Sequence, residues 1–327
     1  MTAPLLQVAG LSVAFRGARG GVQALDDVSF TVAAGETVAL VGESGSGKTV
    51  AALSVMQLLP ARTASIHGGS IRFAGDDVLA MDEAGLRAFR GARAAMIFQE
   101  PMTSLNPVLT IGDQVAEPLL LHRGLSRRAA LAEARELLRR VRLPDADALL
   151  KAYPHQLSGG MRQRVMIAQA IACRPTLLIA DEPTTALDVT VQAQVLALLA
   201  ELQRELGMAL LLITHDLAVV AQVAARTVVL YAGRVAEEGP TPRILEAPAH
   251  PYTRGLLAAT LELGGGRRGR IPEIPGSVKL VPAPEPLCHF APRCPLAAAD
   301  CLAGRPTLRE IGPRHRAACL HPAAPHD

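Results

Sequence analysis

Eight consecutive residues carry groups suited to binding the phosphates of a nucleotide. The segment GESGSGKT fits the pattern G-x-x-x-x-G-K-[ST]. Its glycines let backbone N–H groups turn inward around phosphate oxygens, and a following helix adds partial positive charge at its start. The lysine can place its ammonium on the β- and γ-phosphates, and the threonine hydroxyl can ligate Mg²⁺. We therefore predict a phosphate-binding loop formed by Gly42, Glu43, Ser44, Gly45, Ser46, Gly47, Lys48 and Thr49.

Two carboxylates follow an apolar run further along the chain. Thr176–Ala180 has the composition of a buried strand and ends in Asp181 and Glu182. A buried strand that delivers acids at its carboxyl end places them in a ligand crevice. Asp181 suits the coordination shell of Mg²⁺, and Glu182 points in another direction and can polarise an attacking water. Together with the loop, these acids predict a P-loop nucleoside triphosphatase.

A second anion site is predicted at Leu157–Gln163, whose sequence is LSGGMRQ. Ser158 can cap a helix, and Gly159 and Gly160 expose backbone N–H donors at its start. One chain would then carry two phosphate sites for one bound nucleotide. This indicates that the second site serves a nucleotide held by a partner.

The surrounding elements must hold these groups at the edge of a sheet. Short β-like runs alternate with turns over residues 5–40, and the buried run Thr37–Val41 leads into the phosphate loop. Val50–Leu59 has the pattern of a helix that stops at Pro60. From residue 176 to 231, strands and helices alternate, which predicts a parallel sheet flanked by helices. Between about 112 and 157 the pattern is helical, with Ser126 as a cap.

The bulk composition excludes some classes of protein. A net charge of +3 and 3% aromatic residues without Trp give no basis for nucleic-acid binding. No run reaches the roughly 18 apolar residues of a spanning helix. The amino terminus lacks the basic start of a signal peptide, since its first cation is Arg16. We therefore expect a cytoplasmic protein.

Taken in order, the motifs resemble those of ATP-binding subunits of ABC transporters, and LSGGMRQ resembles the ABC signature sequence. The resemblance implies ATP and Mg²⁺ as ligands and a head-to-tail dimer, in which Ser158, Gly159, Gly160, Gln163 and Asp188 face the partner's nucleotide. It also implies four further roles. Gln99 senses Mg²⁺ and contacts the permease, Asp188 lies in a loop that crosses the dimer, His215 contacts the γ-phosphate, and Phe15 stacks on adenine.

Two further segments narrow the resemblance. Phe98–Pro107, with the sequence FQEPMTSLNP, and His250–Thr253, with HPYT, resemble the ATP-binding subunits of dipeptide, oligopeptide and nickel importers. The resemblance implies an α/β ABC ATPase core over residues 1–240. This core has a RecA-like sheet, an antiparallel β part and a helical subdomain inserted at about 112–165. A small Cys-rich extension follows over 241–327.

The implied partners are a second ATPase subunit, two transmembrane permease subunits and an extracytoplasmic substrate-binding protein, at the cytoplasmic face of the cell membrane. The implied function is ATP-driven import of dipeptides or oligopeptides.

Four cysteines fall in the last 40 residues, separated by 5, 6 and 17 residues. In a reducing compartment such a group indicates metal ligation before disulfides. The spacing lacks the close pair common in zinc sites and suits a cluster wrapped by a loop, although zinc or free thiols remain open. The family resemblance implies a [4Fe–4S] cluster held by Cys288, Cys294, Cys301 and Cys319. Cys173 is interpreted as a small buried apolar residue.

The carboxyl-terminal segment needs an anchor. Gly264–Arg270 has the composition of a flexible crossing, and residues 271–327 are rich in proline with little periodicity. Such a segment buries too little apolar surface to offset its ordering entropy. The four clustered cysteines are the only candidates that the sequence offers to tie it down.

Other functions compete with peptide import. The same machinery imports nickel, glutathione or antimicrobial peptides in related systems. A soluble ABC ATPase of DNA repair or translation is a rival from another class, but those proteins carry paired ATPase halves or long insertions. A third alternative is a redox or metal sensor with ATPase activity as its output. The sequence does not specify the substrate, or whether the ATPase dimer contains one or two kinds of chain.

Overall fold

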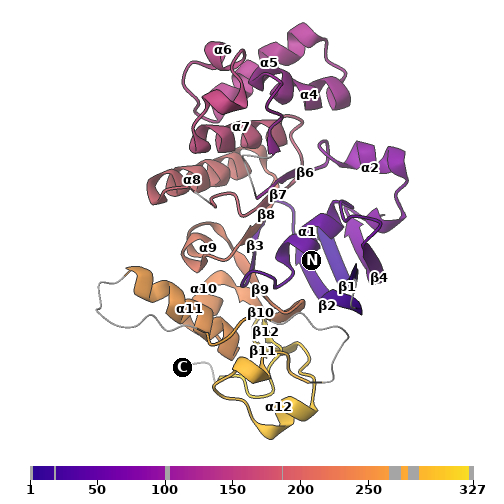
Figure 1. The fold of residues 1–327 in the computed structure, drawn as a ribbon, viewed down its shortest axis with the longest axis vertical. Coiled ribbons are helices and arrows are strands. Elements are labelled where there is room, and N and C mark those ends of the chain that lie inside the picture. Colours follow the sequence, from indigo (N-terminus) through magenta and orange to yellow (C-terminus); the bar gives the residue numbers. More distant parts are fainter. Residues whose placement is uncertain are drawn as a thin grey trace. The chain divides into compact units, whose positions relative to one another are not determined.

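The structure is a computed structural model, drawn in Figure 1. It describes residues 3–17, 20–99, 104–185, 187–264, 274–278 and 287–323. The chain divides into two compact units. Unit 1 comprises Met1–Ala33, Thr37–Leu79 and Ile213–Asp327, and unit 2 comprises Ala34–Glu36 and Ala80–Leu212. The predicted domain boundary at residue 240 lies within unit 1. The division into two units does not test this boundary, which stays a prediction.

Unit 1 contains two groups of neighbouring strands. The first is antiparallel, in the order β2-β1-β4-β5, with β1 (Leu6–Gly17), β2 (Gly20–Val32), β4 (Ala64–Phe73) and β5 (Asp76–Asp77). The second runs β11-β12-β10-β9-β3, with β3 (Thr37–Val41), β9 (Arg226–Tyr231), β10 (Arg234–Pro240), β11 (Arg309–Gly312) and β12 (His315–Ala317). The pairing of β3 with β9 is parallel, whereas β9, β10, β12 and β11 pair antiparallel.

The helices of unit 1 follow these strands. They are α1 (Lys48–Val55), α9 (Leu217–Val223), α10 (Thr241–Glu246), α11 (Pro251–Gly264) and α12 (Ala299–Ala303), with short 3-10 turns at Val78–Ala80 and Ala291–Arg293. The helix predicted to reach Leu59 ends earlier, at Val55. It stops because Gln57 adopts a left-handed φ of 51°, which breaks the helical path before Pro60 is reached.

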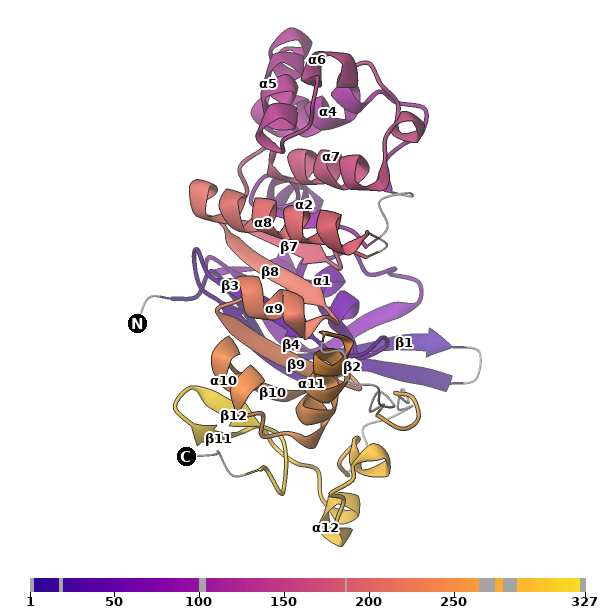
Figure 2. The ribbon, with the colours of Figure 1, turned by 90° about the vertical axis from the view of Figure 1, so that its left-hand side faces the viewer.

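Unit 2 holds the predicted helical region. β6 (Ala94–Ile97) and β7 (Leu177–Asp181) pair in parallel, and β8 (Ala209–Thr214) is the neighbour of β7. The helices are α2 (Glu83–Phe89), α4 (Ile111–Arg123), α5 (Arg127–Arg140), α6 (Ala146–Leu149), α7 (Gly159–Ile171) and α8 (Val189–Leu206), with a 3-10 turn at Pro154–Gln156. Figure 2 shows α4, α5, α6 and α7 grouped together. The cap prediction is confirmed, because the Ser126 side chain accepts from the Ala129 amide.

The carboxyl-terminal segment is anchored by more than its cysteines. β12 pairs with β10, with Ala317 opposite Glu237. Phe290 is 2% exposed and packs against Tyr231 and Tyr252, at ring-centroid distances of 5.1 and 5.5 Å. The prediction that cysteines alone could hold this segment is therefore wrong. The anchors are two short strands and one buried aromatic ring. These elements are too short to produce a helical or strand periodicity that can be recognised in the sequence. Residues 265–270 of the predicted crossing lie outside the described residues.

Candidate functional site

The phosphate loop joins β3 to α1 within unit 1. β3 is buried at all five positions, as expected for an apolar strand in the interior of a sheet. The loop then needs glycine at Gly47, whose φ is 105°. A Cβ atom there would lie 2.7 Å from Leu25 Cδ2 and 2.8 Å from the Ala24 carbonyl oxygen. The close packing of the loop on β2 therefore selects a residue without a side chain.

Lys48 opens α1 and is 5% exposed. Its ammonium donates to the carbonyl oxygens of Gly42 at 2.7 Å and Glu43 at 2.9 Å. Ser44 and Gly45 are exposed at the tip of the loop, and Thr49 is half-buried. The lysine is thus held close to the loop backbone, while the middle of the loop faces solvent.

The acids of unit 2 lie at the end of β7. Asp181 is the last residue of the strand and is 1% exposed. Glu182 follows with a left-handed φ of 46°, an uncommon conformation for a residue with a side chain. Gln99 Nε2 and Thr185 Oγ1 both donate to Glu182 Oε2, at 3.0 and 2.9 Å. The structure therefore brings together Gln99 and Glu182, which the sequence places 83 residues apart.

The signature segment begins α7. Ser158 accepts a hydrogen bond from the Met161 amide at 3.3 Å and caps the helix as predicted. Gly160 packs against α8, because a Cβ atom there would lie 2.7 Å from Val191 Cγ1. Gln163 is 1% exposed, so its side chain points into the unit and away from solvent. Asp188 is exposed and caps α8 by accepting from the Val191 amide at 2.9 Å.

Three further residues named in the sequence analysis lie in different parts of the chain. His215 is exposed directly after β8. Phe15 is half-buried on β1, opposite Val22 of β2 and Ala64 of β4. Cys173 is half-buried rather than fully buried, and its thiol donates to the Pro118 carbonyl at 3.3 Å. Residues 100–103 of the FQEPMTSLNP segment and residue 186 lie outside the described residues.

The four tail cysteines share one electrostatic environment. Cys301 and Cys319 are buried, and Cys288 and Cys294 are half-buried. Burial raises the pKa of the Cys319 thiol to about 11, and the charges of the other three cysteines raise it further. Burial also raises the pKa of Cys288, with smaller contributions from Cys301 and Cys294. Segments 31 residues apart therefore bring all four thiols close enough to influence one another.

Three potential metal ligands come together in the tail, and one of them is a tail cysteine. Among the described residues, the group of three potential ligand atoms within 4.8 Å of one another is formed by Asp300, Cys301 and His321. His321 Nε2 lies 2.8 Å from Asp300 Oδ2 in an ion pair at the surface.

The HPYT segment is held by a buried carboxylate that sequence reasoning missed. Glu237 of β10 is 0% exposed and accepts from the amides of Ala249 at 2.7 Å and His250 at 2.9 Å. His315 Nε2 lies 2.7 Å from the same carboxylate. Burial acts to raise the pKa of Glu237, but the hydrogen bonds from His315 and the backbone lower it below its ordinary value. The signal in the sequence was the pair of adjacent glutamates, Glu237 and Glu238, in the short segment RVAEEGP.

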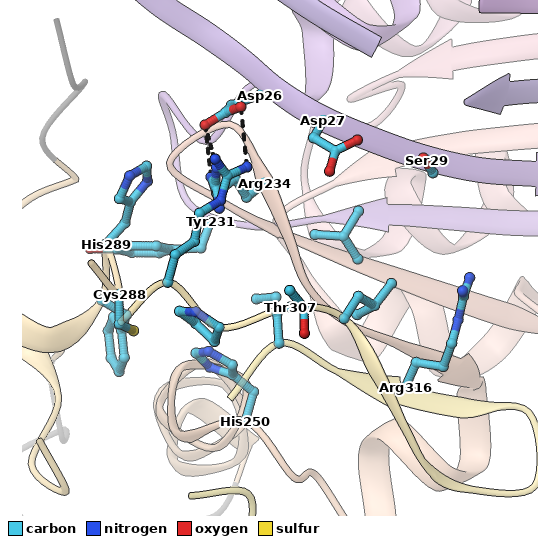
Figure 3. Close-up of a pocket in the computed structure, with 17 residues that line it drawn as sticks. Asp26, Asp27, Ser29, Tyr231, Arg234, His250, Cys288, His289, Thr307 and Arg316 are labelled. Atoms are coloured by element: carbon cyan, nitrogen blue, oxygen red, sulfur yellow. Dashed lines mark hydrogen bonds and ion pairs between the residues drawn. The ribbon is translucent and has the colours of Figure 1, made fainter. Parts of the chain in front are cut away.

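A cavity of about 320 Å³ lies between the β9–β10 hairpin, the middle of β2 and the tail (Figure 3). Asp26 accepts from Arg234 Nε at 2.9 Å on one wall, and Cys288 and His289 line another. The arginines of the lining are paired with carboxylates: Arg234 and Arg305 with Asp26, and Arg316 with Glu238. These pairs neutralise the lining, and we assign the cavity no ligand.

Two family models match this chain in two separate stretches. The model described as ABC transporter matches residues 25–185, and the model described as oligopeptide/dipeptide transporter, C-terminal region, matches residues 236–301. A putative peptide import ATP-binding protein of Brucella melitensis is 51% identical over 327 residues, covering 97% of each chain. A probable peptide ABC transporter ATP-binding protein of Sinorhizobium fredii is 50% identical over 315 residues, covering 96% of this chain and 94% of its own length.

Solved structures match about three quarters of this chain. The ATP-binding cassette MJ0796 in a dimeric post-hydrolysis state with ADP and Pi has a TM-score of 0.65 and 29% identity, covering 72% of this chain and 98% of that one. The cbiO1 protein of Clostridium perfringens, part of an ABC transporter complex, has a TM-score of 0.64 and 25% identity, covering 75% and 92%. Within the described part of the chain, no helix combines the length and apolar character needed to cross a membrane.

Proposed function

This chain belongs to the ATP-binding proteins of the oligopeptide/dipeptide ABC transporter family, and we propose that it hydrolyses ATP to power the import of short peptides. The observation that carries the proposal is that one chain contains both family matches. Residues 25–185 match the ATPase, and residues 236–301 match the extension of peptide transporters. A relative that is 51% identical over 97% of both chains is named a putative peptide import ATP-binding protein, which supports the same substrate class.

We assign the chemistry of hydrolysis to five residues. Lys48 neutralises phosphate charge, and Glu182 orients the attacking water and takes up its proton. Gln99 holds the Glu182 carboxylate through its 3.0 Å hydrogen bond. Oxygen atoms of Thr49, Gln99 and Asp181 fit the preference of Mg²⁺ for oxygen ligands. When bound, Mg²⁺ would neutralise charge that develops on the phosphates.

The remaining assignments concern ATP recognition and the dimer. Phe15 would stack on the adenine, and His215 would contact the γ-phosphate. The start of α7 offers free N–H groups to an anion because Ser158 and Gly159 are exposed. We infer that this helix start binds the nucleotide of a second ATPase subunit, together with the exposed Asp188. The buried Gln163 would support α7 from inside the unit.

The proposed assembly contains two ATPase subunits, two permease subunits in the cytoplasmic membrane and an extracytoplasmic protein that delivers the peptide. In such an assembly this chain binds at the cytoplasmic face of the membrane and selects no substrate itself. The experiment is co-purification with the membrane proteins encoded beside it, followed by reconstitution into vesicles. Uptake of labelled di- and oligopeptides that needs ATP, and stops with Lys48→Ala, supports peptide import. Uptake of nickel or glutathione with no peptide uptake would refute it.

We further propose that the tail cysteines hold a [4Fe–4S] cluster. The support is the donor set, which consists of four cysteine thiols in the folded tail, two buried and two half-buried. A [4Fe–4S] cluster uses four cysteine thiolates as ligands. The sequence spacing of these cysteines also lacks the close pair that is common in zinc sites. Because β12 and Phe290 already anchor the tail, the cluster would reinforce a fold that has other supports.

A further inference from the structure

The extension contacts the phosphate loop at its second residue, Glu43. The Glu43 backbone N–H donates to the Tyr252 hydroxyl at 2.7 Å. The Glu43 carboxylate accepts two hydrogen bonds from the Arg293 guanidinium, at 2.6 Å to Oε2 and 3.0 Å to Oε1. Two residues that lie 209 and 250 positions further along the chain therefore hold one residue of the loop.

Both contacts are largely shielded from water. Tyr252 is 0% exposed, and its ring packs against Tyr231 with centroids 4.6 Å apart. The Arg293 side chain is 7% exposed, and the Glu43 side chain is 27% exposed. Paired hydrogen bonds between a guanidinium and a carboxylate fix both direction and distance, and they strengthen when water is excluded. This pairing therefore restricts the loop far more than a surface ion pair would.

Arg293 is itself held from behind. It donates to the carbonyl oxygens of Ile274, Pro275 and Gly276, at 3.2, 2.8 and 3.2 Å. Ile274 in turn packs on α11, where a Cβ atom at Gly255 would lie 2.8 Å from Ile274 Cγ1. The guanidinium cannot move toward or away from the loop without giving up hydrogen bonds on its other side. Arg293 therefore couples the position of Glu43 to that of the extension.

Glu43 also connects to the lysine that meets the phosphates. The Glu43 carbonyl oxygen accepts from Lys48 Nζ at 2.9 Å. The amide and carboxylate of Glu43 are thus held by the extension, while its carbonyl holds Lys48. The orientation of the peptide at Glu43 influences where the Lys48 ammonium lies before nucleotide binds.

We propose that Arg293 and Tyr252 are positioning residues for the phosphate loop, so that the extension sets the loop geometry that receives ATP. The proposal rests on the proposed function in taking ATP as the ligand. A loop held in its binding geometry loses less conformational freedom when ligand binds, which lowers the dissociation constant. Releasing Glu43 from the extension should weaken ATP binding on the order of tenfold, as for other couplings between separate parts of a protein.

The test is a double-mutant cycle in the full-length chain, with ATP affinity measured by calorimetry. Arg293→Gln and Glu43→Gln should each raise the Kd for ATP on the order of tenfold. The double variant should be no weaker than the weaker single variant, because both changes remove the same contact. Tyr252→Phe removes only the hydroxyl and should raise the Kd by a smaller factor. Arg305→Gln is the matched control, since Arg305 lies in the same extension and pairs with Asp26 instead.

Thermal unfolding of each variant separates positioning from folding. A residue that only stabilises the fold would lower the melting temperature and leave the Kd of the folded protein unchanged. Wild-type affinity in the Arg293, Glu43 and Tyr252 variants would overturn the positioning role and leave the proposed function standing. Additive effects of Arg293→Gln and Glu43→Gln would overturn the link between those two residues. Failure of the wild-type chain to bind ATP would overturn the proposed function together with this proposal.

Discussion

The Gln99 side-chain amide donates to the Glu182 carboxylate at 3.0 Å, and the Thr185 hydroxyl donates to the same oxygen at 2.9 Å. One carboxylate oxygen, Oε2, is therefore oriented by two side chains. Glu182 also lies in a left-handed backbone conformation, which sets its side-chain direction apart from that of Asp181. This arrangement suits a residue that must present a carboxylate in one fixed orientation.

Glu182→Gln should abolish most hydrolysis and preserve ATP binding. The substitution keeps the size of the side chain and removes the carboxylate that takes up a proton from water. In the assembled transporter we expect ATP turnover to fall by about a hundredfold or more, as is usual when a general base is lost. Phosphate release measures turnover, and retention of labelled ATP measures binding. Glu201→Gln, at an exposed site on α8, is the control, and equal turnover in wild type and Glu182→Gln would refute the assignment.

Ser158→Arg should block hydrolysis through the partner subunit. The change removes the cap of α7 and fills the exposed helix start with a bulky cation. The isolated chain should still bind ATP with nearly wild-type affinity, because its own phosphate loop is untouched, but the assembled transporter should not turn over. Ser126→Arg is a matched control, since Ser126 caps α5 with the same 3.3 Å geometry in the same unit. Normal turnover of the Ser158 variant in the complex would be incompatible with a shared site.

The tail should carry iron when the protein is purified without oxygen. We expect brown protein with about four irons and four sulfides per chain. Alanine at Cys288, Cys294, Cys301 or Cys319 should remove the colour, whereas Cys173→Ala should keep it. Because β12 pairing and Phe290 also anchor the tail, we expect its protease sensitivity to rise without complete loss of structure. Stoichiometric zinc without iron would rule out the cluster, and so would metal-free protein.

The stability of the protein should fall as the pH drops from about 6.5 to about 4 because of His250. Burial lowers the pKa of His250 from 6.5 to about 4, and its Nδ1 accepts the Tyr252 amide at 3.0 Å. Between these values the unfolded chain binds a proton that the folded chain excludes, so the free energy of unfolding falls with decreasing pH. The loss from this group is on the order of 3 kcal/mol.

Urea unfolding at several pH values measures this slope. His250→Asn supplies an oxygen in place of Nδ1 and cannot titrate, so it should be less stable near neutral pH and should show a shallower slope above about pH 4.5. His155→Gln, at an exposed position, should keep the wild-type slope. A wild-type slope in the His250 variant would show that other groups govern this pH range.

Some features of this protein were determined by contiguous stretches of sequence. The buried strand before the glycine-rich loop, the buried strand that ends in the acids, and the caps at Ser126 and Ser158 were all predicted and are present. These features depend on hydrogen bonds between residues a few positions apart and on the burial of short apolar runs. Their geometry follows from local residue types, and a pattern in the sequence is enough to indicate them.

Tertiary structure alone decided which residues the extension contacts. Neither Arg293 nor Tyr252 stands out in the sequence as a neighbour of Glu43, and the prediction that cysteines alone hold the tail failed for the same reason. The partners of Glu43, Glu237 and Phe290 come from segments far away in the chain. No local periodicity or residue spacing in the sequence indicates such pairings. They arise only when separate elements pack together and exclude water from the polar groups between them.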